Sequence, residues 1–276
     1  MKSSCETNLW QFFNQMRMTV VVGILFICVG CRTVPITERT QLMLTTEDYE
    51  NACGLTAYDE YLQKYNRSDN AEYNEALRRC GAAISRVAER DDFNWKFVLL
   101  DSPIENAFCL PGGKVAFYTG VVDRMENEAE MAFVMGHEIA HAIARHGGER
   151  ISWGMLTSLG GYLLEQGSSS ERVRLAYGLG TELGVTKPFS RDNESEADQI
   201  GLILMARAGY DPRVVPAFWR RFSAGASSDM LGSLLSTHPC DEERIQAMEE
   251  NMAVAEEEYA KASDKRGVGK VFREGE

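Results

Sequence analysis

The stretch MAFVMGHEIAHAIARH, residues 131–146, decides the fold of this chain. It contains the pattern HExxH at His137, Glu138 and His141. Residues four apart share one face of a helix, so both imidazoles can bind one metal ion, and Glu138 can contact a water on that metal. The surrounding residues are almost all apolar, which predicts a buried helix. Because buried polar side chains without partners are costly, we prefer a zinc site to a chance match.

A third histidine of this stretch is expected to have a different role. His146 lies five residues after His141, about 140° round a helix, and so does not share the ligand face. We predict a structural role near the helix C-terminus, where a partly cationic side chain is favourable. Gly147 and Gly148 are expected to end the helix.

The segment SRDNESEADQIG, residues 190–201, is the candidate source of a third ligand. A catalytic zinc needs three protein ligands and one position for water. On a helix, Glu194, Asp198 and Gly201 share one face. If Glu194 binds the metal, Asp198 can accept an N–H from a ligating histidine, and Gly201 lets two helices approach closely. The alternative is a surface acid at Glu194. Glu196 points away from this face and is expected to help cap the helix.

The rest of the chain alternates helical and strand-like patterns. Helices are predicted over residues 47–65, 71–89, 194–208, 211–222 and 238–260, and strands over 95–100, 107–110 and 114–119. The first two helices would form an antiparallel hairpin with Cys53 and Cys80 at similar heights, so we predict a disulfide between them; a second hypothesis pairs Cys109 with Cys240. The pattern predicts an α+β, mostly helical fold.

The N-terminus has the pattern of a targeting segment. Residues 19–30, TVVVGILFICVG, form an apolar run that is too short to span a bilayer and typical of a signal peptide. A small residue followed by Cys31 resembles the lipobox of bacterial lipoproteins, although Cys28 stands where that pattern has leucine. We therefore expect residues 1–30 to be cleaved and Cys31 to be lipidated; a buried segment or a weak membrane anchor is the alternative. The position after Cys31 is Arg32 and not aspartate, which resembles the sorting signal of outer-membrane lipoproteins rather than the signal for inner-membrane retention.

Composition narrows the class of protein. The chain has 276 residues, 44% hydrophobic and 25% charged, which excludes a largely disordered chain and a multi-span membrane protein. The net charge is −12 without a basic stripe, so no nucleic-acid partner is expected. A single domain is predicted over residues 31–260, followed by a charged flexible tail over 261–276.

The two metal-binding segments together resemble a known family. HEIAHAIARHGGER followed by PFSRDNESEADQIG is similar to zinc metallopeptidase family 48, the gluzincin family with HtpX-like, Oma-like and CAAX-prenyl-protease-like enzymes. NAFCLPGGKVAFYTG, AGYDP and THPCDEERI are similar to further family segments in the same order. The lipobox followed by TVPITERTQL resembles the bacterial periplasmic lipoprotein branch.

The resemblance implies a zincin-type fold, with a small β-sheet packed on the HExxH helix. It implies one Zn²⁺ per chain, held by His137, His141 and Glu194. Asp198 would contact a ligating histidine, and Glu138 would act as the catalytic base on a zinc-activated water. The expected activity is hydrolysis of peptide bonds in unfolded or misassembled envelope proteins, a substrate class that comes from the resemblance alone.

Two other functions compete with this interpretation. The first is a chaperone-like envelope assembly factor whose zinc site is structural or normally closed. The second is a zinc hydrolase of small molecules. The localisation expected for all three is the bacterial cell envelope, with a lipid anchor at the periplasmic face of the outer membrane; the oligomeric state is left open.

Further residues are candidates for substrate handling. Residues 106–110 are expected to form a sheet edge to which an extended substrate adds as a strand, although an ordinary internal strand is the alternative. The residues assigned to substrate binding are Asn106, Ala107, Phe108, Gly112 and Gly113. His238 is expected near the zinc, where it would stabilise the transition state or close the fourth coordination position. Arg244 would contact the oxyanion or hold an acid. A loop histidine and a surface arginine are the alternatives.

Overall fold

The computed structural model describes residues 30–164, 189–224, 233–269 and 272, with only the backbone for 158–164. The predicted signal peptide therefore lies, apart from Gly30, outside the described residues. None of the helices in these ranges is long and apolar enough to cross a membrane.

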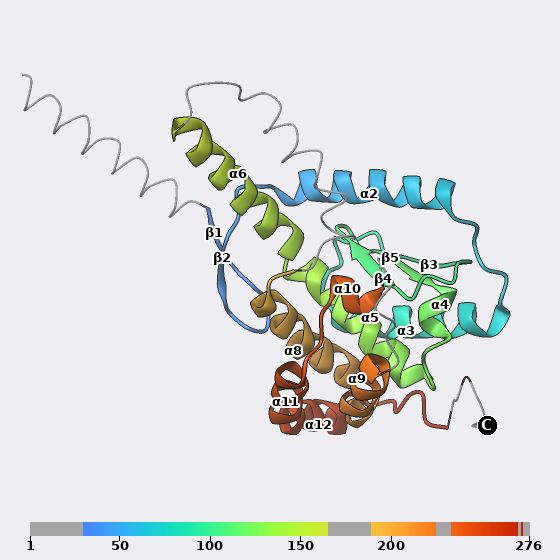
Figure 1. Cartoon of the computed structure of the whole chain (residues 1–276). Helices are drawn as coiled ribbons and strands as arrows, with labels where there is room; N and C mark the ends of the chain where they lie inside the picture. The colour runs from blue at the N-terminus through green and yellow to red at the C-terminus, as the bar shows by residue number, and fades with distance from the viewer. Residues whose placement is uncertain (1–29, 165–188, 225–232, 270–271, 273–276) are drawn as a thin grey trace, which may run out of the picture.

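The described chain is mostly helical, as predicted (Figure 1). Its strands are β1 Cys31–Thr33, β2 Thr40–Leu42, β3 Lys96–Leu100, β4 Ala107–Leu110 and β5 Lys114–Tyr118. Its first helices are α2 Glu47–Lys64, α3 Ala71–Val87, α4 Thr119–Val122, α5 Glu128–Ile143 and α6 His146–Leu164. The later ones are α8 Arg191–Arg207, the 3-10 helix η1 Pro212–Val214, α9 Val215–Ala224, α10 Leu234–Thr237, α11 Glu242–Glu250 and α12 Met252–Lys261.

A three-stranded sheet with the order β3-β5-β4 forms one end of the molecule. β3 runs parallel to β5, whereas β4 runs antiparallel to it. Side chains alternate between the faces of a strand, and the sheet accordingly separates two apolar clusters. One face packs on α2 through Val98, Leu100, Phe108, Ala116 and Tyr118. The other face joins the main core beside α3 and α5 through Leu99, Ala107, Val115 and Phe117. The expected small sheet on the HExxH helix is thus confirmed.

The predicted hairpin of the first two helices is wrong. Helices α2 and α3 form close to the expected bounds, but the sheet lies between them (Figure 1). Cys80 is buried in the main core, where its Sγ donates to Glu128 O at 3.6 Å, and no disulfide joins it to Cys53. Cys109 and Cys240 are not joined by a disulfide either. The prediction failed because both helices have an apolar face, and local periodicity does not show which partner that face meets.

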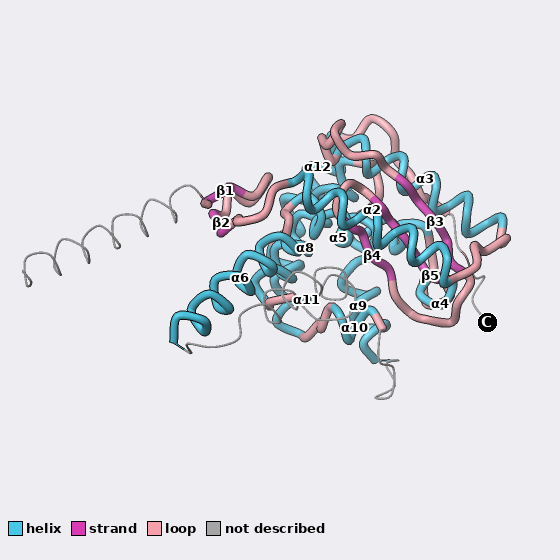
Figure 2. Tube along the Cα trace, turned by 90° about the horizontal axis from the view of Figure 1, so that it is seen from above, coloured by secondary structure: helices cyan, strands magenta, loops and turns pink. Residues whose placement is uncertain are grey.

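A second, two-stranded sheet lies at the opposite end of the molecule from the first (Figure 2). β1 and β2 pair antiparallel, from Cys31 opposite Leu42 to Thr33 opposite Thr40. The loop that joins them contains two non-glycine residues with positive φ, Ile36 (73°) and Glu38 (56°). This hairpin packs against α6, and its loop reaches the start of α8.

Two helix boundaries differ from those predicted near the HExxH pattern. Helix α5 ends at Ile143, and Arg145 takes a left-handed conformation with φ 57°. Helix α6 then begins at His146, so Gly147 and Gly148 lie in its first turn and do not end α5. A Cβ on Gly148 would meet the Glu50 carboxylate and the end of Met43, so the glycine leaves room for these two side chains.

The flexible tail over residues 261–276 stays a prediction, and some of its described residues contact the rest of the chain. Arg266 N donates to Gly209 O at 2.7 Å, and Phe272 N donates to Glu126 O at 2.8 Å. The ring of Phe272 packs on Tyr73 with centroids 5.6 Å apart. Arg266 and Phe272 therefore contact residues near η1 and α5, contacts that the charged composition of the segment does not reveal.

Helices α5 and α8 form the centre of the fold. Every residue of α5 is buried, which confirms the buried helix expected from its apolar sequence. The two helices cross where Gly136 faces Gly201. A Cβ at position 136 would lie 2.9 Å from Gly201 O, and one at position 201 would lie 2.9 Å from His137 N. The close approach expected of Gly201 is therefore confirmed.

Gly201→Ala should lower the free energy of unfolding by about 1–3 kcal/mol, because the added methyl forces α5 and α8 apart. Denaturant unfolding measures the change. Gly154→Ala is the matched control: nothing lies within 4 Å of its added Cβ, so it should be neutral or stabilising by up to about 1 kcal/mol. Unfolding free energies for Gly201→Ala equal to those of the unsubstituted protein would contradict the close crossing.

Candidate metal centre

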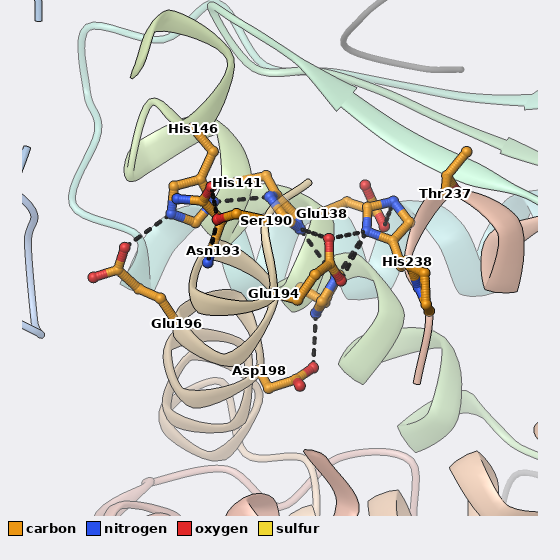
Figure 3. Close-up of polar contacts among 12 residues, drawn as sticks. Glu138, His141, His146, Ser190, Asn193, Glu194, Glu196, Asp198, Thr237 and His238 are labelled. Carbon is orange, nitrogen blue, oxygen red and sulfur yellow. Dashed lines mark hydrogen bonds and ion pairs between the residues drawn. The ribbon is translucent and has the colours of Figure 1, made fainter. Parts of the chain in front are cut away.

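Four buried side chains, carried by α5, α8 and the segment after α10, offer ligand atoms that lie close together. Figure 3 labels three of them, His141, Glu194 and His238, which face one another. His137 and His141 come from α5, Glu194 from the first turn of α8, and His238 follows α10. One ligand atom from each lies within 4.8 Å of the others. The structure thus brings together the three ligands suggested by the sequence and adds His238, which sequence analysis placed near the zinc only as one of two hypotheses.

The separations of these atoms fit a tetrahedral zinc. His137 Nε2 lies 3.1 Å from His141 Nε2 and 3.5 Å from Glu194 Oε2. His141 Nε2 lies 3.5 Å from Glu194 Oε1. Zinc bonds of about 2.0–2.1 Å in tetrahedral geometry place ligand atoms about 3.3 Å apart. Two imidazole nitrogens that face each other across this distance suit a shared cation, because each can then offer its lone pair.

The electrostatics of the cluster also favour a cation. Burial opposes the charged form of His137, yet Asp198 and Glu194 outweigh it and raise its pKa to about 10. Burial likewise opposes ionised Glu194, but His238 and His137 hold the pKa of that carboxyl below its usual range. Burial lowers the pKa of His141 well below its usual value, which keeps the ring neutral and able to bind a metal.

Asp198 and Arg244 support His137 from behind. Asp198 Oδ1 lies 3.0 Å from His137 Nδ1, on the side of the ring away from the cluster. Arg244, itself buried, donates from Nε and Nη2 to the two oxygens of Asp198, each at 2.8 Å. Its Nη1 lies 3.0 Å from Glu194 Oε2. Of the two roles expected for Arg244, the structure places it where it holds acids.

Glu138 is buried beside the cluster, with Oε1 lacking a hydrogen bond within the described part of the chain. The nearest ion-pair partner of Oε1 is His238 Nε2, 3.5 Å away. Burial raises the pKa of Glu138. A buried carboxylate without a hydrogen-bond partner is costly unless a ligand or water completes it, so this atom is poised to act on a molecule bound at the cluster.

His146 lies closer to the centre than the sequence predicted. Its Nδ1 lies 2.8 Å from Nδ1 of His141, and its Nε2 lies 2.9 Å from Glu196 Oε2. Helical geometry excluded this contact, but the left-handed turn at Arg145 ends α5 and redirects the chain. Glu196 is a partner of His146 rather than a capping residue, since the N-cap of α8 is Ser190, which accepts from Asn193 N.

The expected substrate strand is an edge strand within the described sheets, because β4 pairs only with β5. Asn106 precedes it, buried, with Oδ1 accepting from Ala107 N at 2.8 Å, and the buried Phe108 packs on α2's side. Gly112 and Gly113 lie in the turn to β5 with φ 77° and 78°, where added Cβ atoms would meet Asn51 and Trp95. These two glycines serve the turn, and their role toward substrate stays a prediction.

A mainly apolar cavity of about 70 Å³ joins the edge strand to the cluster. Its lining includes Cys109 and Leu110 of β4, His141 of α5, and Phe189. The ring of Phe189 stacks on His141 with centroids 4.1 Å apart. The cavity therefore lies between β4 and His141, one member of the cluster.

Helix α5 with its HExxH pattern, together with the acid on α8, defines a zincin-type site. Residues 70–252 match the family model described as Peptidase family M48. The chain belongs to this family, as its motifs predicted.

Several curated proteins are similar to this chain. The mitochondrial metalloendopeptidase OMA1 of Arabidopsis thaliana is 37% identical over 67% of this chain and 35% of the relative. The protein of the same name from Schizosaccharomyces pombe is 33% identical over 79% of this chain and 65% of the relative. The Beta-barrel assembly-enhancing protease of Escherichia coli is 32% identical over 54% of this chain and 32% of the relative. The chain thus spans between 32% and 65% of the length of these relatives.

The purified protein should hold one zinc per chain, measured by inductively coupled plasma mass spectrometry after dialysis against a weak chelator. His141→Ala and Glu194→Ala should retain less than about a tenth of that zinc, since a catalytic site needs three protein ligands and each variant would have lost one of them. His238→Ala should retain it, because three ligands remain. Circular dichroism checks that each variant is folded. Full zinc content in either ligand variant would show that the metal is held elsewhere.

Proposed function

We propose that this chain is a zinc-dependent endopeptidase that acts on unfolded or misassembled proteins of the bacterial envelope. The observation that carries the proposal is the buried Glu138 carboxylate, whose Oε1 lacks a hydrogen bond within the described residues and lies beside the His137, His141 and Glu194 cluster. Zinc, when bound there, supplies a Lewis acid and lowers the pKa of its water to about 7. Membership of peptidase family M48 supports peptide bonds as the substrate.

Each residue of the cluster then has a defined task. Glu138 Oε1 accepts a proton from the attacking water and passes it to the nitrogen of the leaving amine. Its raised pKa favours both steps, since a base that must also act as an acid works best with a pKa near the working pH. His137 and His141 hold their ring nitrogens toward the metal position, and Asp198 and Arg244 keep His137 oriented.

The edge strand β4 favours an extended polypeptide as substrate. A peptide that adds to this edge gains backbone hydrogen bonds along the strand, and the adjoining cavity offers space for one of its side chains. Folded proteins rarely present a free extended segment, so this geometry supports unfolded or misassembled substrates. A small molecule would not use the hydrogen-bonding edge of the strand.

A second candidate, a normally closed site in an assembly factor, is favoured by His238. Its Nδ1 lies 3.0 Å from Glu194 Oε1 and 3.3 Å from His137 Nε2, a position from which it can fill the fourth coordination place. The segment that carries it is fixed near the edge strand, because Leu234 N donates to Glu105 O at 2.7 Å. In this state His238 would occupy the position of the attacking water, and the protein would bind unfolded or misassembled proteins without cleaving them.

Glu138→Gln should reduce casein hydrolysis by about 10²–10⁴-fold while zinc content stays unchanged, because the substitution removes only the proton acceptor. Cleavage is measured on fluorescent casein with and without a zinc chelator. His238→Ala is the companion variant: a gain in rate together with faster zinc loss to the chelator identifies a closed resting state. Retained hydrolysis by Glu138→Gln contradicts the proposed mechanism, and unchanged behaviour of His238→Ala contradicts the closed site.

We further propose that Cys31 anchors the chain by lipid to the periplasmic face of the outer membrane. Cys31 is exposed at the start of β1, and the similarity to the Beta-barrel assembly-enhancing protease of Escherichia coli supports an envelope location. Because the OMA1 relatives are named as mitochondrial, the proposal depends chiefly on Cys31 and on the apolar run before it.

Cys31→Ser should abolish labelling by a palmitate analogue in a bacterial host and release the protein from the membrane fraction. Two acyl chains or more are needed for a stable anchor, so the change from membrane to supernatant should be nearly complete. Cys53→Ser, on α2, is the control and should remain membrane-bound. Membrane retention of unlabelled Cys31→Ser would contradict the lipid anchor.

A further inference from the structure

We propose that His146, Glu196 and Arg39 are positioning residues that fix the ring of His141 and thereby set how tightly the centre holds zinc. The inference rests on the zinc site proposed above. The contacts run without a break from the metal position to the N-terminal hairpin. His141 Nδ1 lies 2.8 Å from His146 Nδ1, His146 Nε2 lies 2.9 Å from Glu196 Oε2, and Arg39 Nε donates to that carboxylate at 2.8 Å.

The position of each proton follows from these contacts. His141 turns Nε2 toward the cluster, so its Nδ1 must carry the proton and donate it to His146. His146 Nδ1 is then the acceptor, and its Nε2–H donates to Glu196. The Glu196 carboxylate at the far end accepts this hydrogen bond and is itself held by Arg39.

The side chains in this row of contacts are held in fixed positions. His146 is fully buried, so its ring has no freedom to leave the contact. Glu196 accepts from Thr37 Oγ1 as well as from Arg39, and Arg39 also donates to both oxygens of Glu149 at 2.9 and 2.8 Å. Both oxygens of Glu196 are therefore held from outside the helix that carries it.

The other ligating histidine is supported by the same kinds of group. His137 Nδ1 faces Asp198, which is held by two hydrogen bonds from Arg244. Each of the two histidines is thus followed by a carboxylate and then by an arginine. On the His141 side, His146 lies between the histidine and the carboxylate. Partners of this kind fix the tautomer and ring orientation of a metal-binding histidine, and their loss weakens metal binding by about 10–100-fold.

The test compares zinc affinity among variants that keep all ligands. His146→Phe preserves the ring and Glu196→Gln preserves the shape of the side chain, and each should raise the zinc dissociation constant by about 10–100-fold in competition with a chelating indicator. The visible absorption of the Co²⁺-loaded variants should change in band position, since the His141 ring is free to turn. A merely structural role would change neither quantity.

Arg39 offers a gentler pair of variants because it lies in the loop of the hairpin. Arg39→Ala should weaken zinc binding, and Arg39→Lys should restore part of it. This pair decides the matter if His146→Phe does not fold. The matched control is Glu128→Gln, a buried acid on α5 that pairs with Arg79 at 2.8 Å and accepts from Tyr210 Oη at 3.0 Å. It should lower stability without changing zinc affinity.

The outcomes separate this inference from the proposed zinc site. Weaker zinc binding in the His146, Glu196 and Arg39 variants, with the control unchanged, supports the positioning role. Dissociation constants within twofold of the unsubstituted protein, with an unchanged Co²⁺ spectrum, overturn it while the zinc site stands. Absence of zinc binding by the unsubstituted protein overturns both.

Discussion

The cluster of His137, His141 and Glu194 depends on two buried helices that cross glycine against glycine. At the crossing of α5 and α8, an added Cβ on either Gly136 or Gly201 would meet backbone of the other helix at 2.9 Å. This approach places Glu194 and Asp198 of α8 against the histidines of α5. The sheet, α3 and α9 surround α5 with apolar side chains, so the polar cluster lies in an environment where unpartnered charges are costly.

Much of this arrangement could be predicted from the sequence because it is local. The spacing of His137 and His141 puts them on one helix face, and the same rule puts Glu194, Asp198 and Gly201 on another. The family match then follows from these two segments. The edge position of β4 was also expected, since short strands with turn residues between them indicate a small sheet.

Several failures concern how elements are placed relative to one another, and others concern where an element begins or ends. The sequence predicts helices α2 and α3, but no local pattern shows that a sheet separates them. The predicted disulfide between Cys53 and Cys80 depended on a direct hairpin of these helices and is therefore wrong as well. His146 was assigned by continuing α5 past the point where Arg145 reverses the chain. Neither strand of the β1–β2 hairpin was predicted, because three residues are too few to show alternation.

The β1–β2 hairpin extends the proposed metal site toward the N-terminus, beyond the helices that carry its ligands. A fragment trimmed to begin at α2 would retain every residue of the four-membered cluster and both glycines of the crossing. It would lack Thr37 and Arg39, and Glu196 would be left with His146 as its one remaining hydrogen-bond partner among those described here. The hairpin also lies outside residues 70–252, which match the family model, so a fragment cut to those residues would lack these two partners of Glu196.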